Sequence, residues 1–597
     1  MAIATRNYLD NENEPILYKP LLIEKLTWNN LMRPSVLYSA VLSVALSALT
    51  PVLAATPAAK VVAVDGNIPK QVLTNQILYQ YLVAEIAGQR GDMALASEAY
   101  LDLAKITRDP RIAKRATEVA LYARQAKDAE TASRLWLDLD PQSANARQAA
   151  AAILLGGGKL EDAKPYLQQL LAASHEKVGA EFMHLGAMLG NQPDKAAGLV
   201  LIQSLAQPYP NLPEARLATA QAAARAGDFE LALAELDVVQ KLKPDWEAAA
   251  LLRMEVLSRD GKPEGMTYAQ DYLKRYPDAK ELRLGYARML LNQNLLPQSR
   301  DQFKILAKAV PKSPEMQLAI GLISLQLNDL DAADAAFKAA LLLNYADPGS
   351  VQIYLGQVAE ARGHNDEAAS WYKSVREGPQ YLVAQVKYAA LLAKQGKLAQ
   401  ARTYLHATKV ENDADRVALI QAEAGLLQEA KDDAGAYAVL GDALASRPDS
   451  VVLLYDHAMA AERVNQMDVL EKDLRHLLQL QPNHAHALNA LGYTLADHNV
   501  RLAEAEDLLG QALKLAPNDP FILDSMGWAQ YRLGKLAAAI DYLQHAFALR
   551  QDPEIAAHLG EVLWMQGKHK DAQQLWQTSL LASPKNQALL EVMAKFK

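Results

Sequence analysis

The chain has 597 residues, a formal net charge of −8 and no cysteine. The negative charge does not favour binding to nucleic acid, because phosphates bind a basic surface. Without cysteine the chain has no disulfide, no thiolate zinc site, no cysteine nucleophile and no acylated cysteine as a lipid anchor. Only 6% of the residues are aromatic, and strand-like alternation is nearly absent, which favours an all-helical fold.

The first predicted element is an export signal. Val36–Leu49 is an uncharged apolar run followed by small residues, so we expect cleavage after Ala54 or Ala55. A run of this length is typical of the core of a signal peptide and is short for a membrane span. We therefore expect the mature chain to lie outside the cytoplasm.

The residues before the apolar run decide where the signal begins. They carry mixed charge, whereas Met32 opens a compact basic segment. We therefore interpret residues 1–31 as a leader that is non-native or untranslated, and residues 32–55 as the signal peptide. The alternative is an uncleaved anchor helix over Ser35–Ala55. Residues 56–74 are predicted to form a short tether, because two prolines and a glycine interrupt any helix there.

A small residue recurs about every 34 positions along the rest of the chain, in the pattern Ala-x-x-x-large apolar. Helical hairpins that bury their faces on their neighbours produce this period, and fifteen of them fit between residues 75 and 586. Met266 and Ser299 depart from the small residue, which predicts looser packing in their two repeats. The recurring positions are Ala96, Ala132, Ala163, Ala197, Ala232, Met266, Ser299, Ala333, Ala368, Ala401, Ala436, Leu470, Ala505, Ala539 and Ala572.

Two glycine positions recur in the same frame. One lies inside the first helix of a hairpin, where glycine costs about 1 kcal/mol relative to alanine and therefore implies close packing of another helix. The other follows the first helix, where a left-handed backbone conformation favours glycine. The first group is Gly321, Gly356, Gly492, Gly527 and Gly560, and the second is Gly91, Gly227, Gly363, Gly396, Gly534 and Gly567.

Together these features resemble the tetratricopeptide repeat (TPR) superfamily over most of the chain. The resemblance implies an all-α fold, a right-handed TPR solenoid of about fifteen helical hairpins over residues 75–586. Residues 587–597 are then predicted to form a capping helix that covers the last apolar face.

A few local patterns suggest other chemistry. Lys105–Arg115 is a basic run, which is either a solvated helix face or a docking patch for an acidic partner or anionic headgroups. Gly156–Lys159 resembles a phosphate loop, but no Ser or Thr follows the lysine, so we interpret it as a turn.

Three histidines lie near one hairpin and raise the question of a metal site. His484 and His486 are two residues apart and so do not face the same way on a helix, and His498 lies further on. We predict no metal site, no cofactor and no catalytic site. Because repeat units account for every segment, we expect a protein without enzyme activity.

In the TPR family the first helices line a concave groove that binds partner proteins. By resemblance, Trp528 is the strongest candidate for the groove, whereas Phe521 and Tyr531 are candidates either for the groove or for packing between repeats. Trp136, Tyr372 and Trp576 are predicted to be core residues. The full candidate set is Tyr81, Glu85, Gln89, His486, Asn489, Tyr493, Phe521, Asp524, Trp528, Tyr531, Arg532 and Trp564.

Two segments, Ile77–Gly91 and 522–564, are similar to the large exported TPR proteins of proteobacteria. The best understood family is a lipoprotein adaptor that activates a carboxyl-terminal processing protease and brings it to its substrates, peptidoglycan endopeptidases. The resemblance implies the same partners here, in the periplasm, free or associated with the outer membrane, although the chain lacks the lipid-bearing cysteine. The alternative is a TPR scaffold for envelope polysaccharide export or outer-membrane assembly.

Overall fold

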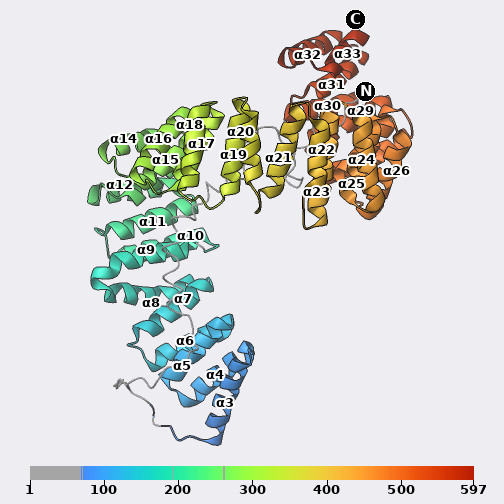
Figure 1. Ribbon diagram of the computed structural model, residues 1–597. Coiled ribbons are helices and arrows are strands. Elements are labelled where there is room, and N and C mark those ends of the chain that lie inside the picture. Colours follow the sequence, from blue (N-terminus) through green and yellow to red (C-terminus); the bar gives the residue numbers. More distant parts are fainter. Residues whose placement is uncertain (1–68, 70, 191, 260–261, 597) are drawn as a thin grey trace. The chain divides into compact units, whose positions relative to one another are not determined.

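The computed structural model describes residues 69, 71–190, 192–259 and 262–596. Within these ranges the chain contains 31 α-helices, one short 3-10 helix and no strand. The described residues divide into two compact units between Asn328 and Asp329. Figure 1 shows the helices of each unit in chain order. The predicted leader, the signal peptide and most of the tether lie outside the described residues.

The helices follow one another as fifteen pairs with α33 after the last pair, which confirms the predicted all-helical TPR solenoid for the described part of the chain. In the first unit the helices are α3 (Asn75–Gln89), α4 (Met93–Thr107), α5 (Pro110–Tyr122), α6 (Ala126–Leu139), α7 (Ala144–Gly156), α8 (Leu160–Ala173), η2 (His175–Lys177), α9 (Val178–Leu189), α10 (Lys195–Ala206), α11 (Pro213–Ala226), α12 (Phe229–Leu242), α13 (Glu247–Leu257), α14 (Glu264–Arg275), α15 (Lys280–Asn292), α16 (Leu296–Ala309) and α17 (Pro314–Gln326). In the second unit they are α18 (Leu330–Leu342), α19 (Pro348–Ala361), α20 (Asn365–Ser374), α21 (Tyr381–Lys394), α22 (Leu398–Ala407), α23 (Asp413–Glu429), α24 (Asp433–Ser446), α25 (Val451–Arg463), α26 (Met467–Leu480), α27 (Ala485–Asp497), α28 (Leu502–Leu515), α29 (Pro520–Arg532), α30 (Leu536–Leu549), α31 (Pro553–Met565), α32 (His569–Ala582) and α33 (Gln587–Lys595).

The recurring small position is the centre of the packing in each repeat. Thirteen of the fifteen predicted residues are buried, and even the polar Ser299 is enclosed and donates a 2.8 Å hydrogen bond to the Ala287 carbonyl. In two repeats the buried small residue is a neighbouring glycine, Gly198 beside Ala197 and Gly265 beside Met266. The expectation of looser packing at Met266 was therefore wrong, because a side chain at Gly265 would collide with Ser258, the residue that follows α13.

The turn glycines adopt the predicted conformation. All six have φ between 75° and 90°, which is the left-handed region that favours glycine. In other repeats the left-handed residue is asparagine, as at Asn294, Asn465 and Asn499, because its short polar side chain tolerates this region better than most.

The glycines inside first helices mark close contacts between the two helices of a hairpin. A Cβ atom at Gly527 would lie 2.6 Å from Leu543 Cγ, and one at Gly560 would overlap the Trp576 indole. Trp576 and Tyr372 are fully enclosed, which confirms that they are core residues. Each missing methyl group therefore makes room for a large side chain from the second helix.

The basic run and the glycine loop have structural explanations. Within the run, Lys105 pairs with Asp102 and Arg111 pairs with Asp109, and both pairs join residues close in sequence. The glycine loop is the turn between α7 and α8, and Lys159 there pairs with Glu130 at 2.7 Å. No helix in the described ranges combines the length and hydropathy that a bilayer span requires.

Candidate protein-binding groove

Nine of the twelve candidate residues lie on α27, α29 and α31, the first helices of three consecutive repeats. Local sequence fixes where two of these helices begin. Asp519 accepts hydrogen bonds from the backbone N–H groups of Phe521 and Ile522, and Asp552 accepts one from Glu554. A proline follows each aspartate and occupies the first helical position, where no backbone N–H is needed.

A buried ion pair joins α29 to α31. The His558 ring donates from Nδ1 to both carboxylate oxygens of Asp524, at 3.0 and 2.9 Å, and both side chains are buried. Burial alone would lower the pKa of His558, but the Asp524 carboxylate outweighs it and the pKa rises above its ordinary value. The imidazolium is therefore held in the repeat interface by its carboxylate partner.

Aromatic rings enclose this pair. The Trp528 ring stacks on His558 with centroids 4.3 Å apart and an interplanar angle of 24°. Tyr493 of α27 lies on another side of the same imidazole, with centroids 6.3 Å apart. Burial, reinforced by the carboxylates of Asp497 and Asp524, raises the pKa of the Tyr493 phenol well above its ordinary value, so this group stays neutral.

The end of α27 is fastened to α29 by the polar atoms of two candidate residues. Trp528 Nε1 donates to the Asp497 carboxylate at 3.1 Å. Arg532 donates to the Ala496 carbonyl at 3.2 Å and also to the Asp497 carbonyl. The Arg532 guanidinium lies 5.4 Å from the centre of the Trp528 ring. These contacts hold the two first helices in a fixed register.

The last repeats continue the network. Tyr531 donates to Glu561 at 3.1 Å, and Lys595 of α33 pairs with the same carboxylate at 2.8 Å. Burial and the Glu561 charge raise the pKa of Tyr531 to about 12. Trp564 stacks on Trp576 and contacts Phe596, so the end of the array is an aromatic cluster.

The other candidates differ in exposure. Asn489 is buried, whereas His486 and Phe521 are half-buried, and the Arg550 guanidinium lies 5.0 Å from the centre of the Phe521 ring. In α3, Tyr81 is 43% exposed and Gln89 is exposed.

Glu85, the third candidate on α3, is half-buried and accepts a hydrogen bond from Tyr100. The structure thus joins Asp524, Trp528, Tyr531 and Arg532 in one network. The three candidates on α3 are not part of this network. Whether any of the candidate residues contacts a partner stays a prediction.

Three residues of this network were missed by sequence reasoning: His558, Asp497 and Glu561. Asp497 and Glu561 occupy the same places in their helices as the candidates Arg532 and Trp528, the thirteenth and the ninth, so the repeat frame could have found them. His558 is the sixth residue of α31, whereas the candidates Asn489 and Asp524 are the fifth of their helices, so the frame passes over it. A search for a histidine one repeat after an aspartate would have found His558, 34 residues after Asp524.

The histidines near α27 have local roles. The His484 ring accepts a hydrogen bond from the Ala487 N–H at 3.1 Å and caps the helix, and His498 contacts the Thr494 carbonyl at 2.9 Å. Burial lowers the pKa of His484. Among the described residues, no group of three histidine, aspartate or glutamate side chains is placed to hold a metal ion.

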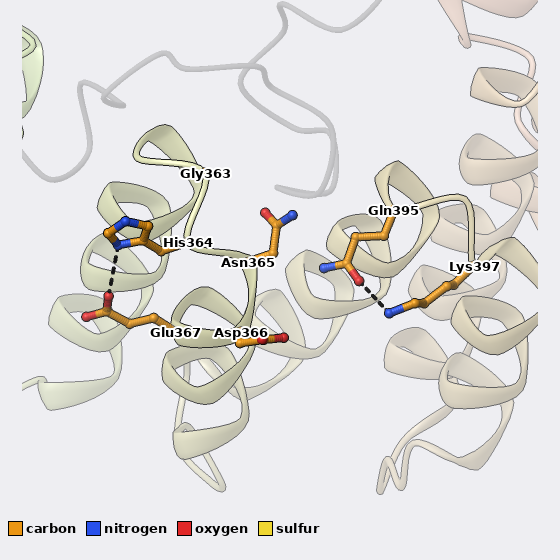
Figure 2. A pocket seen from close by; sticks show the side chains of 7 residues that line it. All are labelled: Gly363, His364, Asn365, Asp366, Glu367, Gln395 and Lys397. Atoms are coloured by element: carbon orange, nitrogen blue, oxygen red, sulfur yellow. Dashed lines mark hydrogen bonds and ion pairs between the residues drawn. The ribbon is translucent and has the colours of Figure 1, made fainter.

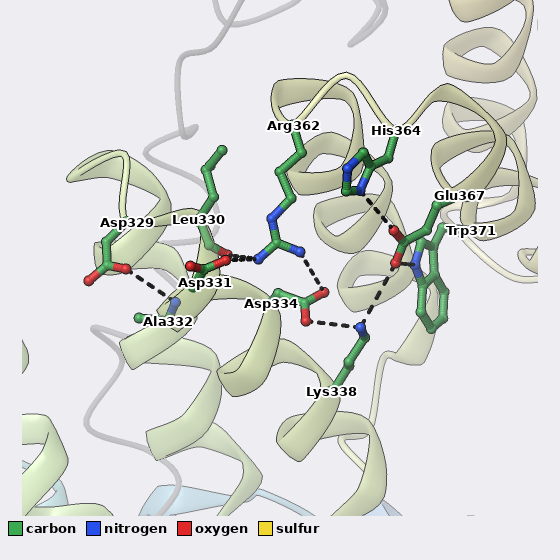
Figure 3. A network of polar contacts seen from close by, with 10 residues as sticks. All are labelled: Asp329, Leu330, Asp331, Ala332, Asp334, Lys338, Arg362, His364, Glu367 and Trp371. Carbon is green, nitrogen blue, oxygen red and sulfur yellow. Dashed lines mark hydrogen bonds and ion pairs between the residues drawn. The ribbon is translucent and has the colours of Figure 1, made fainter.

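Charged contacts between consecutive repeats recur near the hairpin turns. Figure 3 shows one: Arg362, just after α19, pairs with Asp331 of α18 at 2.6 Å, and Lys338 of α18 lies 3.8 Å from Glu367 of α20. The same relation recurs further on, where Arg463 pairs with Asp433 and Arg501 with Glu471.

An open hollow lies beside the network of Figure 3. Figure 2 shows its lining, which runs from Gly363 to Glu367 and includes Gln395 and Lys397. His364 lies 3.5 Å from Glu367, and Lys397 donates to Gln395 at 2.8 Å. Both of these contacts therefore join residues of the lining itself.

Comparison with known proteins agrees with the architecture. The sequence pattern of the tetratricopeptide repeat family matches residues 264–314, 318–381, 455–520 and 525–586. A TPR repeat-containing protein of Pseudomonas aeruginosa is 34% identical over 486 residues, which cover 81% of this chain and 82% of that protein. The chain therefore belongs to the tetratricopeptide repeat family.

Solved structures show weaker whole-chain likeness. An APC/C hetero-tetramer contains a chain with 16% identity and a TM-score of 0.28, and the match covers 82% of this chain and 97% of that one. A tetratricopeptide repeat protein of Parabacteroides merdae has 14% identity and a TM-score of 0.31, with coverage of 47% and 97%. At these TM-scores neither superposition bears on function.

Proposed function

We propose that the chain is an exported, non-enzymatic adaptor that brings a carboxyl-terminal processing protease to peptidoglycan endopeptidases in the periplasm. The observation that carries this proposal is the array of fifteen helix pairs, an architecture whose stacked repeats form extended binding surfaces. Binding enzyme and substrate to one scaffold raises their effective concentration, to the mM range for short flexible links.

The choice of partners rests on the resemblance of two segments to exported TPR proteins. These segments form α3 in the first unit and α29 and α31 in the second. Both contain candidate groove residues, and aromatic and arginine side chains are the ones that most often dominate protein interfaces. We place the protease and its substrate on the candidate groove residues of these two regions, which in α3 are Tyr81, Glu85 and Gln89.

The test measures endopeptidase cleavage by the purified protease with and without this protein. The adaptor role predicts no cleavage by the chain alone, slow cleavage by the protease alone, and faster cleavage when both are present. Tyr81→Ala should reduce the acceleration, because Tyr81 is exposed and available to a partner. The same exposure means that the substitution should leave the fold intact. Tyr122→Ala, a change at an exposed tyrosine outside the candidate set, is the matched control.

A second experiment separates the proposal from its alternative. The tagged protein is crosslinked in the periplasm of its own host, and the captured proteins are identified. Protease and endopeptidases among them support the adaptor role. Polysaccharide synthase or export subunits without the protease would overturn it in favour of an export scaffold, with the TPR fold unaffected.

A further inference from the structure

Helix α3 presents an apolar stripe to solvent at the start of the array. Leu78, Tyr79, Leu82 and Ile86 fall within an arc of about 100° at 100° per residue, as expected for one face of a helix. Tyr79 is 67% exposed, and the other three side chains are each more than 40% exposed. The opposite side of α3 packs on α4 through Ala84 and Ala87.

The same face is covered in later repeats. Counted back from the turn glycine, the position of Tyr79 corresponds to Ile522 in α29 and Ile555 in α31, both fully buried. Ile555 packs with Leu523 and Ala546 of the preceding repeat. The face of α3 is therefore the face on which, elsewhere in the array, a preceding repeat stacks. A terminal repeat normally has a polar outer face at this place.

The lack of charge on the stripe restricts the kind of partner that can cover it. Glu85 is the single charged residue of α3, and it is bonded to Tyr100. Without lysine or arginine the stripe lacks the basic residues with which interfacial helices bind anionic membranes. A charged partner would likewise find no complementary charge. The sequence of the tether before α3 does not favour a covering helix, because Pro57, Gly66 and Pro69 interrupt a helical pattern.

We infer that the occupant is a second copy of this chain. An uncharged apolar stripe is complementary to itself, as the two-fold interface of a homodimer requires, and it brings no like charges together. With Val72 and Leu73, which are also exposed, these six residues have at most roughly 700 Å² of surface to bury per copy, a little below the about 800 Å² per partner of a standard interface. Two α3 helices pack across the two-fold axis near Leu82 and take the place of the missing neighbour.

The experiment measures the mass of the purified protein by sedimentation over a concentration series. The inference predicts a dimer whose dissociation constant rises at least tenfold in Tyr79→Lys, because the substitution buries a charge in an apolar interface. Tyr122→Lys, at a tyrosine that is 69% exposed on α5, should leave the dimer unchanged. A monomer at every concentration, or a dimer indifferent to Tyr79→Lys, would overturn the inference.

A covalent readout tests which face of α3 forms the interface. The chain has no cysteine, so Leu82→Cys introduces a single thiol. Oxidation should convert this variant to a disulfide-linked dimer, whereas Tyr122→Cys should stay predominantly monomeric on a denaturing gel. Equal crosslinking of both variants would show that random collision forms the bond and would contradict a specific α3 interface. Circular dichroism of each variant checks that the fold is retained.

Discussion

The buried ion pair between α29 and α31 allows a quantitative test of what holds the last repeats together. The perturbation is His558→Leu, which leaves the Asp524 carboxylate buried without its cation. Neither side chain has appreciable access to water, so breaking the pair should cost about 3–5 kcal/mol. Replacing both residues by leucine removes the charge with its partner, and the double variant should lie within about 1–2 kcal/mol of the wild type.

The assay is native-state hydrogen exchange of the α29 and α31 amides, because a repeat array opens locally and one global unfolding energy does not describe it. The opening free energies of the wild type, both single variants and the double variant form a cycle that isolates the pair. A double variant as unstable as His558→Leu would refute the reasoning. It would show that the loss comes from the missing ring stacked on Trp528 and not from the unpaired charge.

The same pair predicts a pH dependence. The pKa of His558 is raised in the folded chain, so its contribution to stability is complete below the unfolded value of 6.5 and is lost as pH rises through the folded value. The difference in opening free energy between the wild type and His558→Leu should therefore be largest near pH 6 and shrink at alkaline pH. A difference that grows with pH would contradict a protonated His558.

Two further substitutions test the packing and the charged contacts. Gly560→Ala should destabilise the last repeats by about 1–3 kcal/mol, because the new methyl group overlaps the enclosed Trp576. Gly198→Ala is the control: no atom lies within 4 Å of the new Cβ, so this change should be neutral or stabilising by up to about 1 kcal/mol. Thermal denaturation of the two variants compares these effects. The Arg501 contact lowers the pKa of Glu471 to about 2. The stability that Arg501→Gln removes should therefore be present above the ordinary glutamate pKa and vanish as pH falls toward 2, as urea denaturation at several pH values would show.

The fold could be predicted because it is a periodic property of the sequence. Small residues at the helix contact and left-handed residues at the turn must recur wherever a hairpin stacks on the next one, so many weak signals add up. Gly265, which takes the place predicted for Met266, shows the limit of this reasoning. A repeat period of 34 residues does not reveal that a helix is shifted by one residue along the chain. Only the packed structure shows which small residue faces the neighbouring helix.

The candidate site was less accessible to the same reasoning. Family geometry indicates which positions face inward along the first helices, but it does not say how deeply each is covered. Trp528, the strongest candidate, is buried on His558 with its Nε1 bonded to Asp497. Its neighbours in space, Asp497 and His558, come from α27 and α31, and a frame of inward-facing positions does not show which of these side chains meet.

The two ends of the array differ in whether their outermost apolar face is covered. At the C-terminal end α33 places Leu589 and Val592 against the last apolar face, and Phe596 stacks on Trp576. At the N-terminal end no described residue covers the corresponding face of α3, which has apolar side chains where a terminal repeat requires polar ones. Since burying this stripe gains free energy in proportion to its apolar area, the difference between the two ends points to an interface at the first repeat rather than to an arbitrary end of the array.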